Sequence, residues 1–155
     1  MPMPFYSGAA GPGHVWFWQQ CIDRPDHWYH FARFAKAIEE LDPAGERFKP
    51  VQIPNARLHI YALQGERTFL AWCRDIDNTW QTELVDGRRP VLIQGQTVDL
   101  ARQVGMGLSA TRVRFYDPWM DRWADGHVAD GRILLPDFTR SIVIRLEHVA
   151  PLPQP

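Results

Sequence analysis

The sequence has little cysteine, little net charge and no long hydrophobic run, and each absence excludes a class of protein. Its two cysteines, Cys21 and Cys73, are too few for the disulfide framework of a small secreted domain. A formal net charge of -1 provides no field that would attract nucleic acid or an acidic membrane. No apolar stretch approaches the roughly 20 residues of a membrane-spanning helix. We therefore expect neither a nucleic-acid partner nor a membrane partner.

Motifs for targeting, metal binding and cofactor binding are also lacking. Residues 1–18 have no basic segment followed by a long apolar segment, so they do not resemble a secretory signal, and no cellular location is indicated. His27 and His30 are three residues apart, whereas paired zinc ligands on a helix usually stand four apart with a third ligand nearby. No Ser/His/Asp order, Cys/His pair or Gly-rich phosphate loop stands out. We expect no metal and no cofactor.

The N-terminal part contains one predicted strand and one predicted helix. Residues 14–18 (HVWFW) are apolar on both faces, which favours a strand buried on both sides, as in a parallel sheet. Residues 26–41 form a predicted amphipathic helix, because apolar residues recur at spacings of three and four, and Pro43 prevents its continuation. One strand and one helix cannot cover their own apolar faces. This unit must therefore pack on the sandwich, pair with another chain, with self-association as one possibility, or belong to a larger α/β domain.

From residue 56 the hydrophobic period changes from 3.6 to 2. Alternating residues at 58–63 and 69–73, joined by a turn at 64–66, predict a β-hairpin. Further short alternating segments and two Asp-Gly pairs follow, at 125–126 and 130–131. The fold class we predict is mainly β, with an antiparallel β-sandwich preceded by a single strand–helix unit. The predicted divisions are a strand–helix unit (1–45), a connector (46–55) and a sandwich (56–150).

Two aromatic-rich segments resemble a known family. The run GPGHVWFW at 11–18, followed by DHWYHFARF at 26–34, resembles the last strand and helix of the catalytic (β/α)8 barrel in clan A glycoside hydrolases. The cellulase-like and mannanase-like members carry an accessory C-terminal sandwich. The sandwich strands are similar to these segments of the chain: LHIYAL (58–63), FLAW (69–72), RVRFYDP (112–118), ILLP (133–136) and IVIRL (142–146).

The resemblance implies a function that lies mostly in the partner. The family's two catalytic carboxylates end the fourth and seventh barrel strands, both of which would precede residue 1. A glycosidase needs two carboxyl groups about 5 Å or about 6.5–9.5 Å apart, and no catalytic residue is predicted here. The chain is then a non-catalytic C-terminal accessory region that braces the barrel of a glycoside-hydrolase-like protein. The catalytic barrel is the expected partner.

A carbohydrate-binding module is an alternative that the sequence leaves open. Trp119 and Trp123 are four residues apart in a predicted loop and could form a stacking platform, with Trp80 as a third exposed ring. By the resemblance, Trp18 would lie at the mouth of the barrel, where Gln19 could hydrogen-bond a sugar hydroxyl. These residues compete with ordinary roles as core, interface or loop side chains. The polysaccharide itself is not indicated.

A small complete hydrolase is a second alternative. Its carboxylates would be found among Asp75, Asp77, Glu83 and Asp117. Two of them would have to converge in one cleft with separated pKa values. Asp residues that cap turns are far commoner than acid pairs, so the pattern favours structural roles for this set.

Overall fold

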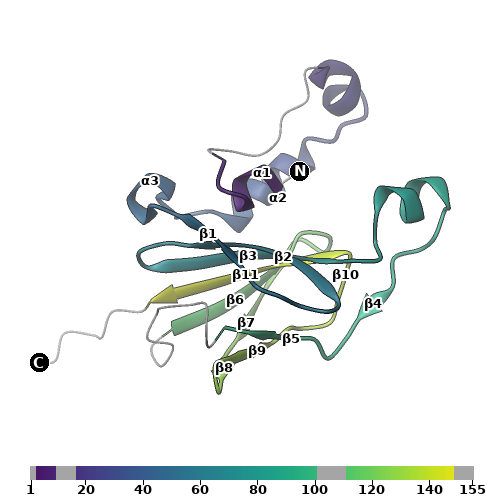
Figure 1. Ribbon diagram of the computed structural model, residues 1–155. Helices are drawn as coiled ribbons and strands as arrows, with labels where there is room; N and C mark the ends of the chain where they lie inside the picture. Colours follow the sequence, from purple (N-terminus) through teal and green to yellow (C-terminus); the bar gives the residue numbers. More distant parts are fainter. Residues whose placement is uncertain (1–2, 10–16, 101–110, 149–155) are drawn as a thin grey trace, which may run out of the picture.

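A six-stranded antiparallel sheet forms the centre of the molecule (Figure 1). The computed structural model describes residues 3–9, 17–100 and 111–148. The strands of the sheet, in spatial order, are β1 (Lys49–Gln52), β2 (Leu58–Gln64), β3 (Thr68–Asp75), β11 (Ser141–His148), β6 (Thr111–Asp117) and β7 (Arg122–Gly126). The predicted hairpin is confirmed, because β2 pairs with β3 from Leu58↔Asp75 to Gln64↔Phe69.

Two small sheets form a second layer against this central sheet. One pairs β4 (Leu92–Ile93) with β10 (Phe138–Thr139), and the other contains β5 (Thr97–Asp99), β9 (Arg132–Leu134) and β8 (Val128–Ala129). The core between the layers is apolar and includes Phe69, Phe115, Ile133, Phe138 and Ile144, all at most 3% exposed. The predicted antiparallel β-sandwich is therefore confirmed.

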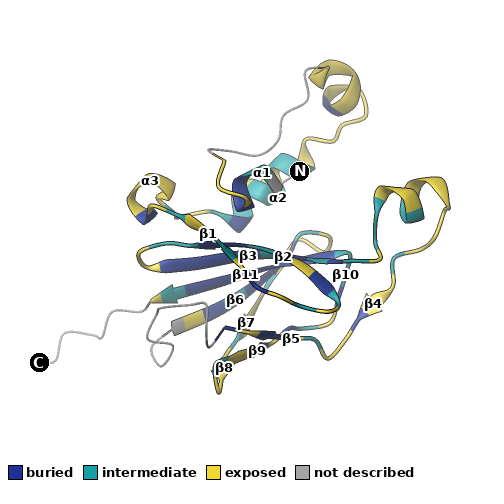
Figure 2. Ribbon diagram, in the orientation of Figure 1, coloured by how far each residue is buried: buried dark blue, intermediate teal, exposed yellow. Residues whose placement is uncertain are grey.

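The outer face of the central sheet is apolar as well, and the central strands are largely buried (Figure 2). In β3, Phe69 and Ala71 enter the sandwich core, whereas Leu70 and Trp72 point to the opposite side, as the period of two requires. Four buried residues of the outer face, Leu63, Leu70, Tyr116 and Val143, form one cluster with Phe5, Tyr6 and Ala37 of the N-terminal helices. The molecule thus has three layers: helices, central sheet and small sheets.

The helical elements are short and come mostly before the sheet. They are α1 (Met3–Tyr6), η1 (Gln19–Asp23), α2 (Tyr29–Ala37), α3 (Pro43–Glu46) and η2 (Gln81–Val85). α1 and α2 lie over the outer face of the central sheet (Figure 1). Within the described residues, no helix has the length and apolar character needed to cross a membrane.

A buried arginine attaches the end of α2 to the central sheet. Arg145, 2% exposed on β11, donates to the Glu39 carbonyl at 2.7 Å and pairs with the Glu147 carboxylate at 2.5 Å. Glu39 lies just beyond the last residue of α2, where helix carbonyls lack partners along the chain. Burial lowers the pKa of Arg145, and the nearby Glu147 opposes that effect.

A buried glutamate makes a second attachment, between α3 and the β2–β3 turn. Glu46 Oε2 accepts hydrogen bonds from the backbone N–H groups of Arg67 (2.9 Å) and Thr68 (3.0 Å). Its Oε1 accepts from the Thr68 hydroxyl at 3.1 Å. The approach requires a glycine, because a Cβ at Gly65 would lie 2.4 Å from Glu46 Oε2.

The N-terminal elements differ from the predicted strand and helix. Residues 14–16 of the predicted strand lie outside the described residues, and its end is a turn at Phe17 and a helical Trp18. The helix predicted over 26–41 is α2, which is shorter at both ends. Asp26 (φ 54°) and Glu40 (φ 63°) adopt left-handed conformations, which an α-helix cannot contain.

Candidate functional site

Residues 17–29, named here the N-terminal excursion, stand away from the sandwich (Figure 1). Four aromatic side chains are exposed on it: Phe17 (63%), Trp18 (40%), Trp28 (45%) and Tyr29 (42%). The rings of Trp18 and Trp28 lie 6.1 Å apart at 54° to each other, so they do not form one flat platform. A cluster of this kind on a surface is typical of a site for a partner.

Local hydrogen bonds give the N-terminal excursion a defined shape. The Trp28 indole donates to Asp23 Oδ1 at 3.1 Å, and the amide of Arg24 donates to the Gln19 carbonyl at 3.0 Å. Gln19 is exposed at the start of η1, directly after Trp18. Ile22 is the buried residue of η1. Trp18 and Gln19 are both exposed and are neighbours in sequence.

Trp119 is held in the turn after β6 by polar contacts. Its indole donates to Ser141 Oγ at 3.0 Å, and its backbone N–H donates to Asp117 Oδ1 at 2.8 Å. The Arg140 guanidinium lies 4.4 Å from the ring centroid, in cation–π geometry. The His30 ring is 6.3 Å away, at a steep angle. The side chain is 37% exposed, so part of its surface is in contact with solvent.

Trp123 has a different environment from Trp119. It lies on β7 opposite Tyr116, with 5.0 Å between the ring centroids, and Arg114 lies 4.6 Å from its ring. Its indole N–H is buried without a hydrogen-bond partner among the described residues. Trp123 packs on the outer-face cluster, whereas Trp119 lies at the rim of a pocket. The structure therefore does not bring these two rings together in one contact.

The four carboxylates of the hydrolase alternative are held by cations or by turns. Asp75, 2% exposed, and Asp77 both form ion pairs with Arg57. Asp117 accepts hydrogen bonds from the backbone N–H groups of the turn that follows β6. These are structural roles.

Glu83 is paired with Arg140, whose Nε donates to Glu83 Oε1 at 2.8 Å. Hydrogen bonds from Arg140 and then Asn78, opposed by partial burial, leave the pKa of Glu83 below its usual value. A general acid of a glycosidase needs the opposite change. Within the described ranges there is also no group of three His, Cys, Asp or Glu side chains that could hold a metal ion.

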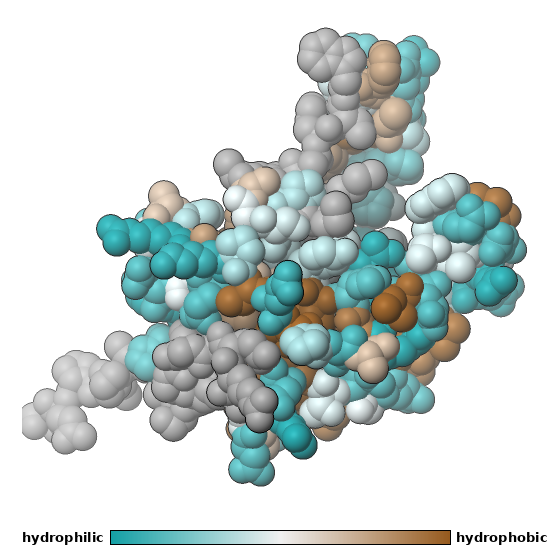
Figure 3. Space-filling model, in the orientation of Figure 1, coloured by the Kyte–Doolittle hydropathy of each residue, from teal (hydrophilic) through white to brown (hydrophobic). Residues whose placement is uncertain are grey.

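A second excursion, residues 76–92, carries exposed apolar side chains that the sequence did not predict as a group. Trp80 is 69% exposed and Leu84 80% exposed, and Val85, Val91 and Leu92 are exposed as well. Hydrophobic atoms gather at the outer end of this excursion (Figure 3). The sequence contains only a weak signal for this exposed apolar group, because the apolar residues stand here among turn formers without a helical or strand period.

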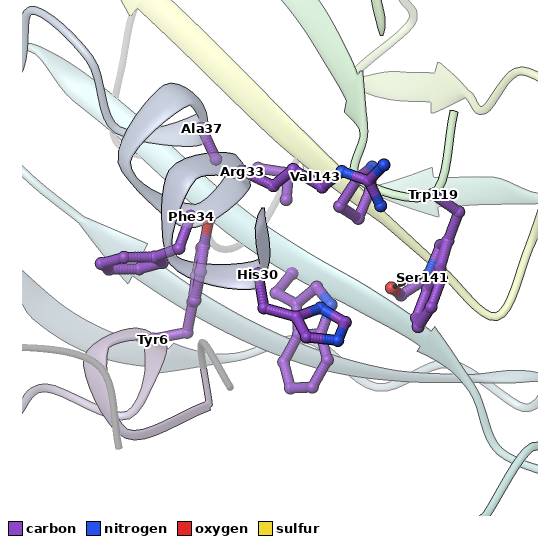
Figure 4. A pocket seen from close by; sticks show the side chains of 10 residues that line it. Tyr6, His30, Arg33, Phe34, Ala37, Trp119, Ser141 and Val143 are labelled. Carbon is purple, nitrogen blue, oxygen red and sulfur yellow. Dashed lines mark hydrogen bonds between the residues drawn. The ribbon is translucent and has the colours of Figure 1, made fainter. Parts of the chain in front are cut away.

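A small pocket of about 80 Å³ lies between α2 and the turn that carries Trp119 (Figure 4). Apolar groups form most of its wall. Polar groups come from Tyr6, His30, Arg33, Trp119 and Ser141. The lining residues are Tyr6, His30, Arg33, Phe34, Ala37, Trp72, Pro118, Trp119, Ser141 and Val143. Burial lowers the pKa of His30, and nearby cationic groups lower it further. The volume is well below the roughly 300–1,000 Å³ of a typical small-molecule site.

Comparison with known proteins finds similarity among solved structures. No family model matches the sequence, and no curated protein matches it. Among solved structures, the chain is similar to a GH30 endoxylanase from Clostridium papyrosolvens C71, with a TM-score of 0.45 and 16% sequence identity. The matched region covers 79% of this chain and 28% of the endoxylanase chain. The chain thus spans less than a third of the structure that it matches.

Proposed function

We propose that this chain is a non-catalytic accessory region of a glycoside-hydrolase-like protein, and that it braces a catalytic (β/α)8 barrel. The observation that carries the proposal is the N-terminal excursion, where four exposed aromatic rings stand beside a helix that is fastened to the sandwich. By the family resemblance, the segments around this excursion correspond to the last strand and helix of a barrel. Its missing neighbours would then be the remaining strands and helices of that barrel.

The energetics of the exposed rings support a partner. Burial of a large apolar side chain contributes about 1.5–3 kcal/mol, and aromatic residues are enriched in the central part of protein interfaces. Burial of Phe17, Trp18 and Trp28 against a partner would therefore contribute several kcal/mol of binding free energy, because these side chains are exposed in the isolated chain. A few such residues commonly supply most of the affinity of an interface.

The attachment of α2 supports a bracing role over a loose tether. Arg145 links the end of α2 to β11, and Ala37 is buried against the outer face of the central sheet. A partner that binds the N-terminal excursion would therefore be held next to a helix that is already anchored on the sandwich. The structural roles of the four candidate carboxylates are consistent with a non-catalytic chain.

The test is association with a barrel supplied as a separate protein. The probe is the (β/α)8 barrel of a cellulase-like glycoside hydrolase, expressed without its accessory sandwich and last strand–helix pair. Sedimentation velocity should detect a one-to-one complex with this chain, and the barrel should gain thermal stability when the chain is present. Substitution of Phe17 and Trp18 by serine should weaken the complex at least tenfold.

Leu84→Ser is the matched control, because Leu84 is apolar and more exposed but lies on the other excursion. It should leave the affinity for the barrel unchanged. A chain that stays monomeric and forms no complex with the barrel would contradict the proposal. So would a complex that is weakened equally by the control and by the aromatic substitutions.

A further inference from the structure

The pocket beside α2 has hydrogen-bond donors and one cationic group, the Arg33 guanidinium, but no carboxylate. None of its ten lining residues is Asp or Glu, whereas Arg33 and His30 both line it. Arg33 reaches from α2 toward the side of the pocket that holds Trp119 (Figure 4). Within the part of the chain that the structure describes, Arg33 takes part in no ion pair, and its guanidinium lies 4.8 Å from the Tyr29 ring centroid. A half-buried guanidinium of this kind retains its capacity to bind an anion.

Ser141 supplies a further donor at the opposite wall. The residue is 4% exposed, and its Oγ accepts the hydrogen bond from the Trp119 indole. Among the described residues, Ser141 Oγ serves only as an acceptor, so its own proton is available to a ligand. The pocket therefore offers donors from two elements far apart in sequence, α2 and β11.

The neighbouring carboxylate does not neutralise the pocket. Asp121 accepts a hydrogen bond from the Tyr116 hydroxyl at 2.6 Å and pairs with Lys36 at 2.9 Å. Those two contacts, more than the charge of Arg33, hold the pKa of Asp121 below its usual value. Asp121 is not among the lining residues, so the charge balance inside the pocket remains positive.

The dimensions limit what can enter. A volume of about 80 Å³ is less than a third of the roughly 300 Å³ at the lower end of typical small-molecule sites. A whole sugar ring or an aromatic acid exceeds that space, but a carboxylate with one or two carbons does not. The walls of Phe34, Trp72 and Val143 suit the carbon next to the carboxylate.

We propose that this pocket binds a carboxylate end-on, with Arg33 and Ser141 as hydrogen-bond donors and the apolar wall around the adjacent carbon. The carboxylate could belong to a small free acid or to an Asp or Glu side chain of a docked polypeptide. Both sources present the same chemistry to the pocket. The inference goes beyond the bracing role and can be tested without any barrel.

The experiment measures binding of two probes by the full chain. Sodium acetate represents the free acid, and the capped tripeptide acetyl-Gly-Glu-Gly-amide represents the side chain. The readouts are the NMR shift of the Trp119 indole N–H and the rise in melting temperature that ligand binding produces. Sodium chloride at equal ionic strength and the matching Gln tripeptide are the reference probes. We expect saturable binding that the reference probes do not reproduce.

Variants separate the pocket from general electrostatics. Arg33→Gln should weaken binding at least tenfold, because a charge-assisted bond is lost. Ser141→Ala should weaken it about threefold to tenfold and gives a second test if the first variant does not fold. Arg122→Gln, which removes an exposed arginine on β7, should change nothing.

The outcomes discriminate between the two sources and the failure of the inference. Binding of acetate but not of the Glu tripeptide would identify a small free acid, and the reverse would identify a docked side chain. Binding of both would support the site for either source. Responses equal to those of chloride and the Gln tripeptide, or binding that survives both Arg33→Gln and Ser141→Ala, would overturn the inference.

Discussion

Substitution of Glu46 by alanine should destabilise the protein, although Glu46 neither lines the pocket nor belongs to either excursion. Its carboxylate accepts hydrogen bonds from the backbone N–H groups of Arg67 and Thr68 and from the Thr68 hydroxyl. Glu46 and Thr68 are 2% and 4% exposed, so the two Thr68 donors would lose their acceptor inside the protein. The Arg67 amide belongs to an exposed residue and can bind water instead.

The magnitude follows from the number of buried donors. Each one left without an acceptor costs about 1–3 kcal/mol, and water that enters the space offsets part of the loss. We expect Glu46→Ala to lower the free energy of unfolding by about 2–4 kcal/mol. For a chain of this size that corresponds to a fall in melting temperature of roughly 6–15 °C. Glu46→Gln keeps one acceptor oxygen and should lose less than half as much.

Urea denaturation monitored by circular dichroism and by tryptophan fluorescence measures the free energy of unfolding. Glu66→Ala is the control, because Glu66 is an exposed glutamate of the same turn, with a carboxylate that accepts no hydrogen bond among the described residues. A loss under about 0.5 kcal/mol for Glu46→Ala, equal to that of an ordinary surface substitution, would refute the reasoning.

Three further predictions concern pH, thiol reactivity and sugars. Because Arg140 holds the pKa of Glu83 below its unfolded value, this pair should stabilise the fold above about pH 4.3 and lose that contribution as pH falls through the lower, folded pKa. Glu83→Gln should therefore flatten the stability profile below pH 5, and an unchanged profile would contradict the assignment. Cys21 is exposed and Cys73 fully buried, so a thiol reagent should modify Cys21 at once and Cys73 only after urea is added; simultaneous reaction would contradict the burial of Cys73. Soluble glucans and mannans should leave the tryptophan fluorescence of the isolated chain unchanged, because the proposed bracing role requires no sugar site, whereas saturable quenching that Trp119→Phe abolishes would favour the carbohydrate alternative.

The sandwich could be predicted because its strands carry their own period. Leu58, Ala62, Phe69 and Cys73 alternate with residues of the other face, and local alternation is sufficient to predict a hairpin. The run HVWFW has no alternation of this kind. A short apolar run without alternation is compatible with a strand or with a buried turn. Its last two residues lie in a turn and a helical segment.

The ends of α2 and the pocket depend on information that a periodic pattern does not contain. Asp26 and Glu40 take left-handed conformations, which no hydrophobic spacing predicts for residues other than glycine. Arg33 and Ser141 line one pocket only because β11 lies in the middle of the central sheet and α2 crosses its outer face. Juxtaposition over more than a hundred positions requires the tertiary fold.

The two apolar faces of the central sheet have a consequence for how this region can be inherited. A sandwich whose outer surface is polar can be transferred between genes as a cassette, because it remains soluble wherever it is placed. Here Leu63, Leu70, Tyr116 and Val143 lie under the N-terminal helices, so strands β2 to β11 transferred alone would expose an apolar surface. Recombination that keeps both faces of the sheet covered must therefore carry the helices together with the strands. The three-layer assembly is the unit that keeps both faces of the central sheet covered.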